Sequence, residues 1–195
     1  ESASLETRET TVGLLQALAE IALSYQSNHR LRQLLAKESF WHELDAAILD
    51  INHNLKPHAT AMSIARQAAR LTASDRATLL TCRGHRCRVE AINSPVTIHP
   101  RSRQVKLLRR LSEEVVRSGS SLQFTACDGQ TAAIAAYPSL DSYLDESQSR
   151  SVRCELLYES TEPGHRSHPL GLLVLEGFTA EHREEWDDRI AVLAH

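Results

Sequence analysis

The order of periodic segments in this 195-residue sequence predicts an α+β fold: an antiparallel sheet with helices packed on it, preceded by a helical N-terminal extension. Three observations carry the prediction. Residues 5–72 are rich in Leu, Ala, Glu, Gln and Arg, which favour helices. From Arg76 onward, short β-rich runs replace the helical period. One long helical pattern, at residues 102–119, then separates two groups of strands.

We expect residues 1–40 to form a helical extension or linker and residues 41–195 to form the main domain. Two apolar stripes have the spacing of a helix that buries one narrow face: Leu14, Leu18, Ile21 and Tyr25, and then Trp41, Leu44, Ile48, Ile51 and Leu55. Residues 27–29 contain Ser and Asn, which favour turns and predict a break between the stripes. Each stripe spans about two heptads, so two interpretations stay open. The helices form a hairpin packed on their own domain, or they pair with a second copy in a homodimer.

Local signals place the first elements of the domain. Pro57 permits a helix start, and the apolar face of that helix comprises Ala61, Ile64, Ala65, Ala68 and Leu71. The β-rich runs around residues 83–86 predict a hairpin with a four-residue loop. Ser102 is the predicted N-cap of the next helix and Gly119 its stop. A strand at residues 121–127 follows.

The remaining sequence alternates between an irregular segment and regular elements. Residues 127–150 show only a short helical pattern, and long loops of this kind often carry function. Residues 151–160 and 168–177 predict two strands, and the second is apolar on both faces, as expected of a central strand. A final helix is expected after the cap residue Thr179.

Composition excludes several classes of function. The net charge of −3 gives no general attraction to nucleic acid, and no stacking aromatics are interleaved with the basic residues. No apolar run approaches the roughly 18 residues of a membrane span, so we expect no direct membrane insertion by this segment. Four Cys are too few for a disulfide scaffold, which favours reduced thiols and a cytoplasmic location. The sequence ends inside an apolar helical pattern, which we interpret as a segment of a longer protein.

The stretch "TCRGHRC" at residues 81–87 has three candidate roles. Cys82, His85 and Cys87 supply three ligands at most, fewer than a structural zinc site needs. Cys82 and Cys87 face each other across the predicted hairpin, with Cβ atoms about 4.5–5.5 Å apart, slightly beyond the usual disulfide range. The favoured interpretation is a pair of thiols on a half-buried face that Cys87, Val89 and Ala91 share, with a solvated cationic tip. A disulfide is the alternative.

Ordered segments of the sequence resemble a known family, the GAF domains. A helix leads into a strand through Ala73, Ser74 and Asp75; a second helix ends in Gly119; and a closing hairpin carries the pattern from Gly171 to Phe178. The resemblance covers residues 44–195. It implies a sensory or regulatory module that binds a small molecule and dimerises through its flanking helices. The segments "SRQVKLLRRL" and "LDSYLDESQSRSV" further resemble GAF modules fused to bacterial membrane-fusion (efflux adaptor) proteins, which would make the parent protein membrane-associated.

The resemblance implies a ligand pocket between the sheet and residues 127–150. The candidate ligand-binding residues are Phe124, Cys127, Asp128, Tyr137, Tyr143 and Cys154. We expect a non-catalytic regulatory domain with no metal site and a ligand or cofactor that the sequence does not identify. One alternative is a degenerate GAF fold that serves only in dimerisation and assembly. Another is a thiol-dependent methionine sulfoxide reductase, since some GAF proteins use a thiolate and a resolving thiol in the pocket.

Overall fold

The computed structural model describes residues 23–31, 38–53, 56–94, 99–126, 131–159 and 168–179. The chain divides into two compact units, Glu1–Ala46 and Ala47–His195. Residues 23–31 and 38–52 are helical. The predicted break at residues 27–29 is wrong, because a Ser or Asn inside a helix costs only a fraction of a kcal/mol. Leu14, Leu18, Ile21 and Leu55 lie outside the described residues.

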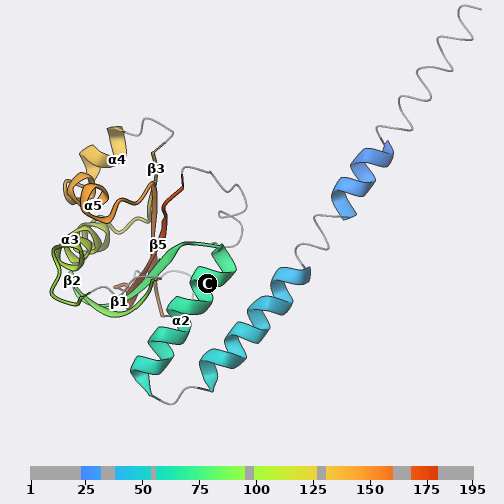
Figure 1. Ribbon diagram of the computed structural model, residues 1–195, viewed down its shortest axis with the longest axis horizontal. Helices are drawn as coiled ribbons and strands as arrows, with labels where there is room; N and C mark the ends of the chain where they lie inside the picture. Colours follow the sequence, from blue (N-terminus) through green and yellow to red (C-terminus); the bar gives the residue numbers. More distant parts are fainter. Residues whose placement is uncertain are drawn as a thin grey trace, which may run out of the picture. The chain divides into compact units, whose positions relative to one another are not determined.

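The second unit is built on a five-stranded sheet of described strands in the order β2-β1-β5-β4-β3 (Figure 1). All neighbouring strands run antiparallel, as the sequence predicts. The strands are β1 (Arg76–Arg83), β2 (Arg86–Asn93), β3 (Leu122–Thr125), β4 (Ser151–Leu157) and β5 (Gly171–Gly177). The central strand β5 is buried along its whole length, which confirms the interpretation of its apolar sequence.

Helices cover both faces of the sheet (Figure 1). On one face, α2 (Pro57–Thr72) packs small residues such as Ala65 and Ala68 against inward side chains of β1, β2 and β5. On the other face lie α3 (Arg103–Ser118), α4 (Thr131–Ala136) and α5 (Ser139–Ser147), around the largest apolar cluster. Since side chains alternate along a strand, Leu172 and Val174 of β5 face α3, while Leu173 and Leu175 face α2.

The β1–β2 hairpin is tighter than the sequence predicts. Arg83 pairs with Arg86, so the loop contains two residues, not four, and Gly84 adopts a φ of 60° that suits glycine. Register shifts between Leu79 and Leu80, so that Glu90 is an extra residue in β2. This bulge moves Ala91 to the α2 face, away from the face of Cys87 and Val89, and corrects the simple alternation inferred from sequence.

Helix α3 confirms its predicted ends. The Ser102 side chain accepts a hydrogen bond from the Val105 amide, and Gly119 closes the helix with a φ of 68°. The short helical pattern predicted within residues 127–150 is confirmed as α5, whereas α4 makes residues 131–136 more regular than expected. The helix expected after Thr179 lies outside the described residues. In the part of the chain that is described, no helix has both the length and the apolar character needed to cross a membrane.

Candidate functional site

A cleft of about 1080 Å³ lies at the end of the sheet where β1 and β4 begin and β2, β3 and β5 end. The first turn of α3 and the last turn of α5 also reach it. Its volume lies just above the range of about 300–1,000 Å³ that is typical of small-molecule sites in proteins. The described lining residues are Arg76, Ser94, His99, Ser102, Gln104, Phe124, Ala126, Ile134, Asp141, Leu144, Asp145, Glu146, Ser147, Gln148, Ser149, Arg150 and Phe178.

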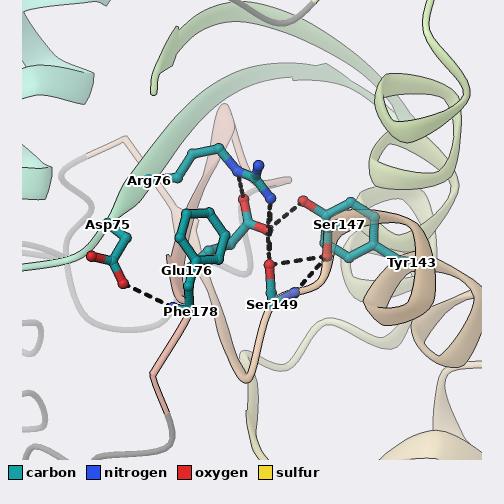
Figure 2. Close-up of polar contacts among 7 residues, drawn as sticks. All are labelled: Asp75, Arg76, Tyr143, Ser147, Ser149, Glu176 and Phe178. Atoms are coloured by element: carbon teal, nitrogen blue, oxygen red, sulfur yellow. Dashed lines mark hydrogen bonds and ion pairs between the residues drawn. The ribbon is translucent and has the colours of Figure 1, made fainter. Parts of the chain in front are cut away.

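Arg76, which lines this cleft, forms a buried ion pair with Glu176; Figure 2 shows the pair. Arg76 and Glu176 are opposite each other in the β1–β5 register, so their side chains emerge from the same face of the sheet. The Arg76 Nε donates to Glu176 Oε2 at 2.5 Å, and Nη2 donates to Oε1. This two-point geometry is the strongest way to pair a guanidinium with a carboxylate. The side chains are 6% and 0% exposed, respectively.

Hydroxyl groups complete the shell of the Glu176 carboxylate (Figure 2). Tyr143 Oη and Ser149 Oγ each donate to Glu176 Oε1 at 2.7 Å, and Ser147 Oγ donates to Ser149 Oγ at 2.9 Å. Gln104, with its amide oxygen turned toward Arg76, accepts from Nη1 at 2.8 Å and from Nη2 at 2.9 Å. The network therefore joins β1 and β5 to α3, α5 and the segment before β4. A buried ion pair needs this degree of satisfaction to be tolerated.

Burial and charge act together on the titration of these groups. Burial lowers the pKa of Arg76, but the hydrogen bonds and negative charge of Glu176 outweigh it, so that the net shift is upward. Burial, and next the charge of Glu176, raise the pKa of Tyr143 well above its ordinary value. Tyr143 is therefore a neutral hydroxyl donor and Arg76 a permanent cation at physiological pH.

Phe178 closes one side of the ion pair (Figure 2). Its ring lies 5.1 Å from the Arg76 guanidinium carbon, a cation–π distance. The Phe178 amide donates to Asp75 Oδ2 at 2.8 Å, which holds the chain after β5 against the start of β1. The GAF-like turn around Asp75 and the Phe at the end of the closing hairpin thus meet at the cleft.

The candidate ligand-binding residues predicted from sequence do not all lie at the cleft. Phe124 lines the cleft. Tyr143 is buried beneath it as a donor to Glu176. Tyr137 is buried elsewhere, and its hydroxyl lies 3.2 Å from Ser118 Oγ at the end of α3. Cys154 is fully buried in the core on β4, where burial raises the pKa of its thiol. Cys127 and Asp128 lie outside the described residues.

The ion pair was not predicted from sequence, although a signal for it exists. Glu176 is the sole charged residue in the run "PLGLLVLEGF", and a carboxylate on a strand buried on both faces requires a partner. Arg76 offers a weaker signal, since an arginine that begins a strand is commonly solvated. Gln104 and Ser149 carry no pattern that marks them. Among the described residues, no group of three or more His, Cys, Asp or Glu has the arrangement of a metal site.

The fold has known counterparts among solved structures. The GAF domain of an Acinetobacter phosphoenolpyruvate-protein phosphotransferase is 14% identical, with 80% of this chain and 88% of that chain covered and a TM-score of 0.53. The chromophore-binding domain of the bacteriophytochrome RpBphP3 from R. palustris is 10% identical, with coverage of 80% and 59% and a TM-score of 0.54. Free methionine-R-sulfoxide reductase from Neisseria meningitidis, in complex with its substrate, is 12% identical, with coverage of 80% and 83% and a TM-score of 0.52. This chain therefore has a GAF fold. No protein-family model and no curated protein matches its sequence.

Proposed function

We propose that this chain is a non-catalytic GAF-type regulatory domain that binds a small molecule in the cleft beside Arg76. The observation that carries the proposal is the cleft itself, which combines a volume of about 1080 Å³ with a buried, hydrogen-bonded polar wall. Two proteins of the same fold, by their descriptions, bind a chromophore and a substrate. A rigid wall next to an accessible space is the usual construction of a ligand site.

The charges of the lining indicate the chemistry of the ligand. Asp141 and Asp145 project from one face of α5, four residues apart, and Arg150 follows the same helix. All three are exposed, and aromatic Phe124 lines the same space. We therefore favour a small zwitterion, such as an amino acid or a derivative of one, over a strongly anionic ligand.

A thermal-shift screen with a matched pair of variants tests the proposal. Amino acids, nucleotides and haem are added to the wild-type protein, and we expect at least one amino-acid-like compound to raise the melting temperature. Ala126→Trp fills the cleft, whereas Ala135→Trp places the same side chain on an exposed position of α4 outside the lining. The shift is expected to vanish in the first variant and to persist in the second. A shift that survives Ala126→Trp would place the ligand elsewhere, and no shift with any compound would contradict ligand binding.

The candidate pocket thiol Cys154 gives no support to a reductase. Catalysis of that kind needs an accessible thiolate with a lowered pKa. Cys154 is fully buried, and its pKa is raised by that burial. Turnover of free methionine sulfoxide, with Cys127→Ser as the control, separates the reductase from the regulatory domain.

We further propose that residues 38–52 pair with the same helix of a second copy and relay the signal. Trp41 and Ile48 lie seven residues apart on one face and are 52% and 45% exposed. Light scattering tests this: we expect a wild-type dimer and a monomeric Trp41→Gln/Ile48→Gln variant. Met62→Gln, on the exposed face of α2, is the control that stays dimeric. A wild-type monomer would refute the pairing. Attachment to a membrane-fusion protein rests on sequence resemblance and is tested by the adjoining sequence of the parent gene.

A further inference from the structure

The strand register brings Cys82 and Cys87 together at the tip of the β1–β2 hairpin. They are direct partners in the register, and their Sγ atoms lie 3.2 Å apart. The Cys82 amide donates to Leu170 O, on the side of β1 away from β2. Cys82 and Cys87 are therefore a non-hydrogen-bonded pair, the type in which cross-strand side chains approach more closely. Their Cβ atoms are therefore expected at the short end of the range for cross-strand pairs.

The surroundings hold the two thiols in place while leaving a route to solvent. Both thiols belong to the apolar cluster beneath α3, and Arg109 Nε donates to the Cys87 carbonyl at 3.1 Å, which ties the hairpin to that helix. Cys82 is 8% exposed and Cys87 is 2% exposed. All residues of the tip, from 83 to 86, are exposed. A local opening of the tip would thus expose the two thiols without unfolding the sheet.

The two thiols differ in their chemistry. When Cys82 is deprotonated, Cys87 is the donor of the hydrogen bond between the two sulfurs, and this bond lowers the pKa of Cys82 despite burial and the nearby Glu113 carboxylate. The same hydrogen bond, followed by burial, raises the pKa of Cys87, and the positive charge of Arg109 only partly opposes this. Cys82 is the more exposed thiol as well as the one whose pKa is lowered, so it is the expected attacking thiol. Cys87, whose Sγ lies 3.2 Å away, is placed to resolve an adduct formed on Cys82.

We propose that Cys82 and Cys87 form a reversible dithiol–disulfide couple that exchanges with low-molecular-weight disulfides. The Cys82 thiolate attacks one sulfur of a small disulfide, breaks its S–S bond and releases one small thiolate. Cys87 then loses its proton and attacks Cys82 Sγ, which forms the Cys82–Cys87 bond and releases the second small thiolate. The two protons from the protein thiols end on the two released thiolates. The protein sulfurs are oxidised by two electrons, and the small disulfide is reduced.

Thiol counting on the full chain tests the couple, with oxidised and reduced glutathione as the probe. The chain has four Cys. After equilibration of the folded protein with excess oxidised glutathione, we expect two of the four thiols to be lost, with peptide mapping placing the bridge between residues 82 and 87. Excess reduced glutathione should restore both thiols. The double variant Cys127→Ser/Cys154→Ser should behave in the same way.

Single variants test the assigned roles. Cys87→Ser should accumulate one glutathione on Cys82, because no resolving thiol remains. Cys82→Ser should acquire glutathione more slowly, because Cys87 is the less exposed and less acidic thiol. The proposal is overturned if the folded wild-type protein retains all four thiols under conditions that oxidise the unfolded chain. It is equally overturned if the bridge includes Cys127 or Cys154, or if reduced glutathione fails to open it. Mapping of the wild-type protein decides these outcomes even if a variant does not fold.

Discussion

Removal of the charge on Glu176 is the sharpest test of the buried network. Glu176→Gln preserves the shape of the side chain and one acceptor oxygen for Tyr143 and Ser149. It leaves Arg76, whose side chain is 6% exposed, without a counter-charge. We expect the free energy of unfolding to fall by about 3–5 kcal/mol, the usual cost of breaking a buried ion pair by removing one partner.

The hydrogen bonds between Arg76 and Glu176 give an independent and similar value for the loss in the free energy of unfolding. Arg76 makes two bonds to the carboxylate, and each bond to a charged group contributes about 1.5–3 kcal/mol. For a domain of this size, 1 kcal/mol corresponds to about 2–4 °C, so the melting temperature should fall by roughly 10 °C. Urea denaturation followed by circular dichroism measures the loss directly.

A double-mutant cycle and a surface control show whether the loss comes from the buried pair. The double variant Arg76→Met/Glu176→Leu removes both charges, so it should be less destabilised than the sum of Arg76→Met and Glu176→Leu. Glu146→Gln removes one partner of the exposed Arg103–Glu146 pair, 3.5 Å apart, and should change stability by less than about 1 kcal/mol. If Glu176→Gln also cost less than about 1 kcal/mol, or if the two single effects simply added, the buried pair would not be coupled as argued.

Three other substitutions test separate features. Hydrogen bonds, of which the one from Ser63 has the largest effect, lower the pKa of the Asp50 carboxyl from its ordinary 3.8 to about 2. The stabilising effect of the ionised carboxylate is therefore present above pH 3.8 and is lost as the pH falls toward 2. The difference in melting temperature between wild type and Asp50→Asn should shrink over that interval, and a difference independent of pH would contradict this. Gly171→Ala places a Cβ 2.7 Å from the Leu80 carbonyl oxygen, and the loss of stability, measured in urea, should be about 1–3 kcal/mol. Ser112 Oγ is buried without a hydrogen-bond partner among the described residues, so Ser112→Ala should leave stability unchanged or raise it by up to about 1 kcal/mol. A loss of stability of more than about 1 kcal/mol, measured by thermal unfolding, would show that the hydroxyl makes a stabilising hydrogen bond.

The parts of the fold that were predictable depend on signals close together in the sequence. Ser102 and Gly119 bound α3 as expected because helix caps are satisfied by residues within one turn. The pairing of Cys82 with Cys87 followed from a hairpin centred between them. The loop length was wrong by one residue on each side because Arg83 and Arg86 suit a strand end as well as a turn.

Other features were not predictable because their causes are distant or subtle. The bulge at Glu90 depends on the pairing register of β2 with β1, and no residue type in the sequence there predicts it. Helix α4 is only six residues long, so its periodicity is weak against a background of small residues, whereas α5 showed a short helical pattern in the sequence. Among the candidate site residues, Phe124 lies at the cleft, whereas the Tyr137 hydroxyl lies close to Ser118 at the end of α3. Nothing in the sequence distinguishes these two aromatic residues.

The Arg76–Glu176 pair joins residues 100 positions apart, and it limits what the cleft can bind. Glu176 and Gln104 together accept hydrogen bonds from all but one of the N–H groups of the Arg76 guanidinium. A ligand anion would have to replace partners that are already buried and well oriented, and the displaced Glu176 would keep its charge in the core. Arg76 is thus a wall of the cleft and not a free anion receptor. Under the proposed function, an acidic group of the ligand would therefore bind to exposed cations such as Arg150.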